Sequence, residues 1–141
     1  MTITPTPYKQ KSITFTLGGN DFDCRVQNWR LNNNTPTGEK MYSQCSGGTG
    51  GEFVEEPAPD WTLELTFYSD WTLNGISDYL TANDQEVVAF VLRHHEDLAG
   101  HGVQWTGTCT LHAPTVGADA QTTEMTEVVL PVTGKPTYAR L

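Results

Sequence analysis

Apolar and polar residues alternate strictly over residues 61–68, and this stretch sets the pattern for the chain. One face carries Trp61, Leu63, Leu65 and Phe67, and the other carries Thr, Glu and Tyr side chains. A period of two filled with aromatic and Thr residues is typical of a strand that buries one face. We therefore expect a half-buried strand here.

The period then changes from two to that of a helix. Residues 74–80 place apolar side chains at helical spacing, and Asn74 is the expected N-cap. A nearly continuous apolar run follows at 86–92. Such a run predicts a strand covered on both sides, one by the core and the other by the helix or a neighbouring chain. The residues expected to pack the core and the helix are Trp61, Leu65, Ile76, Tyr79, Leu80, Phe90 and Trp105.

Four further segments alternate as strands do. Residues 12–17 and 22–31 flank a Gly-Gly-Asn-Asp turn and predict a hairpin, in which Phe22, Cys24 and Val26 share one side. Residues 103–112 and 122–132 predict two more strands, and Gly107 leaves a gap for a bulky neighbour. About six strands and one short helix in 141 residues predict one domain of α+β, mostly β class: an antiparallel β-sandwich or half-barrel with a flanking helix.

Three segments fall outside this pattern. We interpret residues 1–11 as an N-terminal arm, 133–141 as a C-terminal tail and 32–60 as a long connection with a glycine-rich centre. Connections longer than roughly 12–15 residues are uncommon in compact domains and are usually functional or disordered. The composition of residues 32–60 fits a solvated surface loop as well as it fits a functional connection.

Charge and composition exclude several classes of protein. The formal charge is −9, which argues against an ordinary nucleic-acid-binding surface because phosphate contacts need Lys and Arg. The first residues lack an apolar h-region, and no segment approaches the ~20 apolar residues of a membrane span, so we expect neither a signal peptide nor a membrane segment. The three cysteines, Cys24, Cys45 and Cys109, are scattered and fit a reducing compartment.

The sequence contains few residues that suit metal binding or catalysis. His94 and His95 are adjacent on a strand end and point to opposite faces, which does not suit a zinc site. Cys45 lies in the glycine-rich segment without a neighbouring base, and no Gly-Lys-Ser/Thr follows that segment. We expect no catalytic, cofactor-binding or metal-binding residues. Of the four tryptophans, only Trp71 is not readily assigned to the core, and it is a candidate for a carbohydrate or peptide groove.

The order of these features resembles the major tail proteins, or tail tube proteins, of long-tailed bacteriophages of the siphovirus type. The resemblance covers residues 61–141. It rests on the strand that begins Trp61-Thr-Leu-Glu-Leu, Asp70-Trp71, the helix Gly75-Ile-Ser-Asp-Tyr-Leu80, the strand Val87-Val-Ala-Phe90, Trp105-Thr-Gly107 and the ending Val129-Leu-Pro-Val-Thr-Gly-Lys-Pro-Thr137.

The resemblance implies a structural role in the virion. Proteins of this family have a β-sandwich with a flanking helix, related to the tube of type VI secretion systems. Six copies form a ring, and stacked rings form a hollow tube through which DNA leaves the capsid without specific binding. The implied partners are other copies of the chain and the tape measure, terminator and distal tail proteins. The implied location is the phage tail, after synthesis in the host cytoplasm, and no enzyme activity or membrane contact is implied.

The resemblance also suggests two sets of site residues. The long connection would hold neighbouring copies, with Thr35, Tyr42, Cys45, Gly48 and Phe53 as assembly candidates. The lumen would be lined either by the polar face with Thr62, Glu64 and Thr66 or by the one with Thr106 and Thr108. Two alternatives stay open: another β-sandwich virion component, such as a capsid decoration or tail-completion protein, and a glycan- or peptide-binding module.

Overall fold

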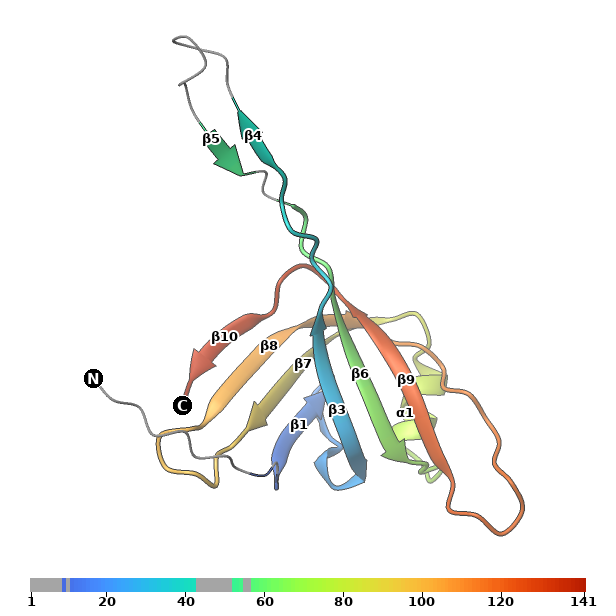
Figure 1. Cartoon of the computed structure of the whole chain (residues 1–141). Helices are drawn as coiled ribbons and strands as arrows, with labels where there is room; N and C mark the ends of the chain where they lie inside the picture. The colour runs from blue at the N-terminus through green and yellow to red at the C-terminus, as the bar shows by residue number, and fades with distance from the viewer. Residues whose placement is uncertain (1–8, 10, 43–51, 55–56) are drawn as a thin grey trace.

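A computed structural model describes residues 9, 11–42, 52–54 and 57–141, and for 41, 42 and 52–54 it describes the backbone only (Figure 1). The described residues form ten strands, one 3₁₀ helix and one α-helix. In chain order they are β1 (Ile13–Leu17), β2 (Asn20–Asp21), η1 (Asp23–Arg25), β3 (Val26–Asn33), β4 (Lys40–Tyr42), β5 (Glu52–Val54), β6 (Trp61–Tyr68), α1 (Ile76–Ala82), β7 (Val87–His94), β8 (Val103–Thr110), β9 (Met125–Val132) and β10 (Thr137–Arg140).

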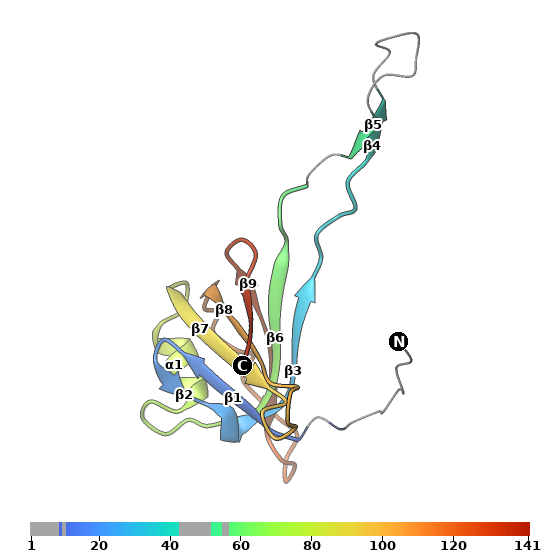
Figure 2. The same cartoon turned by 90° about the vertical axis from the view of Figure 1, so that its left-hand side faces the viewer.

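Eight strands form one antiparallel sheet that curves around the core. Their order is β2-β1-β7-β8-β9-β6-β3, and β10 pairs with β8 outside this path. Two strands share the edge of β8 that faces away from β7. β10 pairs with Val103–Thr106, and β9 pairs there through Val132, which lies opposite Cys109. Figures 1 and 2 show the sheet folded over like an open half-barrel. The predicted α+β, mostly β class, with antiparallel pairing and one helix, is confirmed.

The core fills the concave side of this sheet. On β6, Leu63, Leu65 and Phe67 are fully buried while the intervening residues face outward. The last long strand, β9, alternates in the same way. The helix α1 adds Ile76 and Leu80. Of the predicted packing residues, Leu65, Ile76, Leu80 and Phe90 are buried, Tyr79 and Trp105 are partly buried against the core, and Trp61 is half-buried beside Trp105.

The gap predicted at Gly107 is confirmed. Gly107 lies directly opposite Phe90 in the β7–β8 pair. A Cβ added at Gly107 would lie 3.1 Å from Cε1 of the Phe90 ring. The missing side chain therefore gives the phenylalanine its place in the core.

The hairpin predicted from residues 12–17 and 22–31 is wrong, because β1 pairs with β2 and β7 whereas β3 pairs with β6. The strand predicted for residues 22–31 is also wrong in its first part. Residues Asp23–Arg25 form η1, and the strand begins at Val26. The helical turn rotates Cys24 into solvent, whereas Phe22 is buried and packs against Tyr79. Cys24 therefore does not share a face with Phe22 and Val26. The carboxylate of Asp21 explains the turn, since it accepts a hydrogen bond from the backbone N–H of Asp23 at 3.2 Å.

The predicted N-cap of the helix is also wrong. Gly75 is the N-cap, and Asn74 has a positive φ of 63°. A Cβ at Gly75 would lie 2.6 Å from the carbonyl oxygen of Asp70, so the close approach of these two backbones requires glycine. Asn74 donates its backbone N–H to Asp78 at 3.0 Å instead of capping with its side chain.

Two boundaries near the C-terminus differ from the prediction. The last long strand begins at Met125 and not at residue 122. The segment predicted as a tail contains β10, in which Thr137 pairs with Thr106 and Arg140 pairs with Val103. The pairing partner lies far away in sequence, and for this reason no local pattern predicted the strand.

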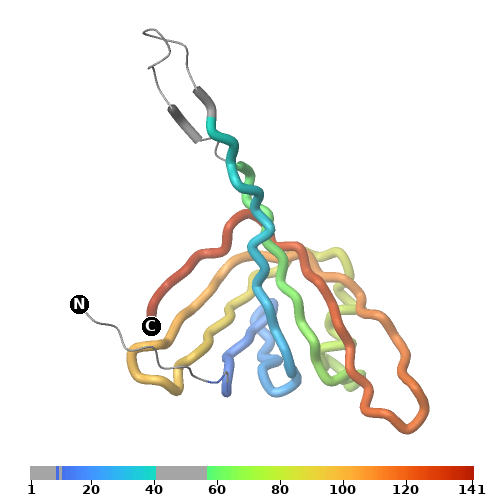
Figure 3. The backbone as a smooth tube through the Cα atoms, in the orientation of Figure 1, coloured from blue at the N-terminus to red at the C-terminus, as the bar shows by residue number. Residues whose placement is uncertain are grey.

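The long connection forms an arm. Its two halves leave β3 and β6 and wind around each other (Figure 3), and the two-stranded ribbon β4–β5 lies beyond the end of the sheet (Figure 1). In this ribbon Lys40 pairs with Val54 and Tyr42 pairs with Glu52. We call residues 34–60 the arm. Most of the predicted N-terminal arm, residues 1–8 and 10, lies outside the described residues.

Candidate assembly surfaces

The two polar faces that the sequence offered as alternatives lie on the same side of the sheet. On β6, Thr62, Glu64 and Thr66 alternate with the buried core residues and so point away from the core. On β8, Thr106 and Thr108 alternate with the inward-facing Trp105 and Cys109 in the same way. We call the side opposite the core the outer face. The choice between the two lumen candidates is therefore a choice between two parts of one surface.

The parts of the outer face on β6 and β8 are mainly polar, and the charge on β6 is partly compensated. Glu64 accepts a hydrogen bond from Nδ2 of Asn32 at 3.1 Å, and Arg30 lies directly opposite Glu64 in the β3–β6 pair. Cross-strand neighbours of opposite charge attract each other. The part of this face on β6 consequently presents hydroxyl and amide groups more than free carboxylates.

In the described part of the sheet, β3 and the shorter β10 each have a single neighbouring strand. There β3 pairs only with β6, and β10 pairs only with β8. Such edges carry unpaired backbone N–H and C=O groups and invite pairing with another chain. A bulge between Val26 and Asn28 distorts the first part of β3, which leaves its second half as the regular edge.

The root of the arm is fastened to the sheet. The backbone N–H of Asn34 donates to the carbonyl of Asp60 at 2.7 Å, and the Asp60 N–H donates to Oγ1 of Thr35 at 2.9 Å. Asn34 also donates from Nδ2 to Oγ1 of Thr62 at 3.2 Å. Among the assembly candidates, Thr35 thus has a defined role in this root. The side chains of Tyr42 and Phe53 and all of Cys45 and Gly48 lie outside the described residues.

Aromatic rings of four strands lie near one another, a cluster that the sequence patterns did not predict. The Trp105 ring lies 6.0 Å from Trp61 and 5.2 Å from Tyr138 between ring centroids. Trp29 lies 5.2 Å from His94. Tyr138 is 51% exposed and the tryptophans are partly exposed. These rings come from β3, β6, β8 and β10, so only the folded sheet brings them together.

His94 connects this cluster to the β7–β8 turn. The Trp105 indole N–H donates to Nε2 of His94 at 3.1 Å, and Nδ1 of His94 lies 2.5 Å from Nδ1 of His95. An indole can only donate, so Nε2 of His94 carries no proton and Nδ1 donates to His95. Burial, and secondarily the nearby charge of His95, lowers the pKa of His94 below its ordinary value of 6.5.

This arrangement predicts a loss of stability at mildly acidic pH. Because the pKa of His94 is lower in the folded chain, the unfolded chain binds more protons as the pH falls below 6.5. The His94 contribution is therefore fully present above pH 6.5 and is lost as the pH falls toward the pKa of the folded state. We expect the midpoint of thermal unfolding to change less between about pH 7.5 and 5 in His94→Gln than in the wild type. The glutamine side chain keeps a hydrogen-bond acceptor for Trp105. His101→Gln, in an exposed turn, is the control and should behave like the wild type; equal pH dependence in the wild type and His94→Gln would contradict the prediction.

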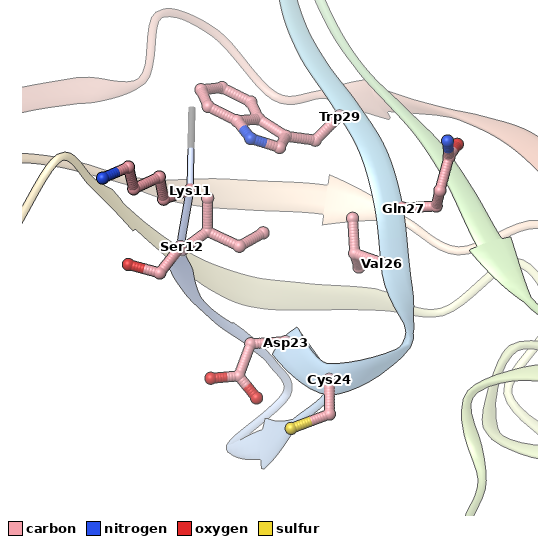
Figure 4. A pocket seen from close by; sticks show the side chains of 8 residues that line it. Lys11, Ser12, Asp23, Cys24, Val26, Gln27 and Trp29 are labelled. Atoms are coloured by element: carbon pink, nitrogen blue, oxygen red, sulfur yellow. The ribbon is translucent and has the colours of Figure 1, made fainter. Parts of the chain in front are cut away.

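A cleft of about 320 Å³ separates the beginnings of β1 and β3. Figure 4 shows Trp29 and Val26 on one wall, Lys11 and Ser12 on the other, and Asp23 with Cys24 at one end. The charge of Asp23 raises the pKa of the Cys24 thiol, which is the opposite of what a nucleophile needs. Burial raises the pKa of Cys109 to about 12. Neither described thiol is activated.

Two other kinds of site are absent from the described ranges. They contain no group of three or more His, Cys, Asp or Glu side chains arranged to hold a metal ion. They also contain no helix with the length and apolar character needed to cross a membrane. A comparison with protein-family models and a comparison with curated proteins find no match to this chain.

Proposed function

We propose that this chain is a structural virion protein that polymerises as stacked hexameric rings into the hollow tail tube of a bacteriophage, the conduit for DNA ejection. The observation that carries the proposal is the arm. It leaves the sheet from two neighbouring strands and extends beyond the body (Figures 1 and 2). Within the described residues, β4 and β5 of the arm pair with each other and not with the eight-stranded sheet, so we expect their partners to be other copies of the chain.

The sheet supports the same proposal. Two strands, β3 and β10, have one neighbour each within the described residues, so adjacent copies in a ring can pair there. The outer face carries Thr62, Thr66, Thr106 and Thr108, whose hydroxyls suit a wall that DNA slides past. The chain has a net charge of −9, which repels DNA and shortens its dwell at any point of that wall.

The other parts of the proposal follow from this role. The partners are further copies of the chain and the tail proteins at the two ends and inside the tube. The site of action is the phage tail, and the role needs no catalysis, no cofactor and no membrane contact. A capsid decoration or tail-completion protein with the same sheet is the first alternative.

A specific observation favours one further candidate function. The cluster of Trp29, Trp61, Trp105 and Tyr138 is partly exposed. Aromatic side chains with an accessible face commonly line ligand sites. A glycan- or peptide-binding module would use this cluster, whereas Trp71, the residue that the sequence suggested, lies elsewhere, beside Glu124.

Negative-stain electron microscopy of the purified full chain tests the proposal. We expect hollow rings or tubes of uniform diameter at high protein concentration. Particles that remain monomeric at every concentration would contradict it. Monomers that also bind a glycan array would support the aromatic module instead.

A further inference from the structure

A patch of exposed apolar side chains lies at the end of the sheet opposite the arm. Tyr68 and Met125 face each other at the end of the β6–β9 pair and are 41% and 39% exposed. Trp71 is 42% exposed and donates its indole N–H to Glu124, the neighbour of Met125, at 3.3 Å. Leu73 is 86% exposed. We call Tyr68, Trp71, Leu73 and Met125 the distal patch.

The loop that presents this patch is held rigidly. The Asp70 carboxylate accepts hydrogen bonds from the hydroxyl of Thr72 at 2.6 Å and from the backbone N–H of Thr72 at 3.2 Å. These hydrogen bonds lower the pKa of the Asp70 carboxyl. Oδ2 of Asp70 also lies 3.4 Å from Nε of Arg25. The backbone N–H of Asp70 donates to Oγ of the buried Ser77 at 3.1 Å. The exposed leucine and tryptophan thus stand on a pre-organised loop. Apolar side chains that are exposed to water on a rigid loop indicate a protein-binding surface.

The arm root offers a matching surface at the other end of β6. Pro57-Ala58-Pro59 runs without helix or strand structure where the arm leaves the sheet, and Ala58, Pro59 and Pro36 are exposed. Extended proline-rich segments bind to aromatic surfaces because they lose little conformational entropy on binding. Eight residues of β6, at about 3.3 Å each, separate the root from the distal patch by roughly 26 Å, so the two cannot meet within one copy.

We infer that the distal patch of one copy binds the proline-rich arm root of the next copy in the stack. This inference rests on the proposed polymerisation and names its axial contact. The arm points away from the sheet along β3 and β6 (Figure 2), so a copy stacked there in the same orientation presents its distal patch first. A contact between two different surfaces at opposite ends of one chain repeats without closing, as a tube requires.

A double variant, Trp71→Ser with Leu73→Ser, tests the contact in the full chain. We expect the concentration needed for half-maximal polymerisation to rise roughly 10- to 100-fold, because two apolar side chains lose their burial. The matched control is Val129→Thr, which removes an exposed apolar group, 51% exposed, from the middle of the outer face. Both variants should unfold within a few degrees of the wild type, because the changed side chains are exposed.

A cysteine pair tests the identity of the partner. In a Cys24→Ser, Cys45→Ser background, Ala58→Cys with Leu73→Cys should give a ladder of cross-linked multimers upon mild oxidation. Each single cysteine variant should give no ladder. Cys109 does not interfere, since it is fully buried.

The outcomes separate the inference from the proposed function. Wild-type tubes, weakened assembly of the double variant and the ladder together support the contact. Wild-type tubes with unchanged assembly of the double variant overturn it and leave the proposed function standing. Dimers cross-linked through Leu73→Cys alone overturn it as well, because the patch then pairs with itself. A wild type that never polymerises overturns both.

Discussion

Removing the arm should abolish polymerisation and leave a folded monomer. The cut is best placed where the strands are already joined, since Asn33 pairs with Trp61 and the Asn34 N–H donates to Asp60. Replacing residues 35–59 by Asn-Gly closes β3 and β6 with a short hairpin turn. We expect the midpoint of thermal unfolding to change by only a few degrees, because β4–β5 forms a separate two-stranded sheet.

Analytical ultracentrifugation together with electron microscopy gives the measurement. The expected result is a monomer at concentrations where the wild type forms tubes. A matched variant removes only residues 43–51, between β4 and β5, and keeps the root. We expect it to polymerise into shorter tubes, since the root contact remains. Tubes of normal length from the variant without the whole arm would show that the arm is not an assembly element.

Much of the sheet could be predicted from the sequence, because strand alternation depends on each residue's own side chain. The alternation at Leu63, Leu65 and Phe67 predicted the buried face correctly. On β9, Thr126, Val128 and Leu130 alternate with exposed residues and are buried. Gly107 was predicted to face a bulky residue, and Phe90 is that residue.

The errors arose where a specific contact, and not the alternation of apolar residues, decides the local structure. Asn74 looks like an N-cap, but the close approach of Asp70 to Gly75 moves the start of the helix. Cys24 fits an alternating strand, yet a 3₁₀ turn interrupts it. β10 has four residues, too few for a periodic pattern, and it exists because β8 offers a free edge.

The candidate surfaces were less predictable than the core. The arm was expected as a long connection, but its ribbon depends on pairing between segments that share no sequence signal. The distal patch combines Trp71 with Met125, which are far apart in the chain and meet only through the β6–β9 register. Trp71 was the tryptophan that could not be assigned to the core, and its exposure agrees with that assessment.

The contact between Phe90 and Gly107 should control the stability of the sheet. Gly107→Val places a side chain within the space of the Phe90 ring and near Cα of Pro136, which lies 3.6 Å from an added Cβ. Overpacking of this kind costs about 1–3 kcal/mol of the free energy of unfolding. Phe90→Leu alone should cost about 1–2 kcal/mol, below the usual cost of Phe→Ala.

The two substitutions together should cost less than their sum, because the smaller leucine leaves room for the valine. We expect a coupling free energy of about 1–2 kcal/mol in a double-mutant cycle measured by urea unfolding. Phe67→Leu is the control, since Phe67 is equally buried but is not among the groups nearest Gly107. Its cost should simply add to that of Gly107→Val. Additive costs for Phe90→Leu as well would mean that the glycine serves the backbone of β8 and not the phenylalanine ring.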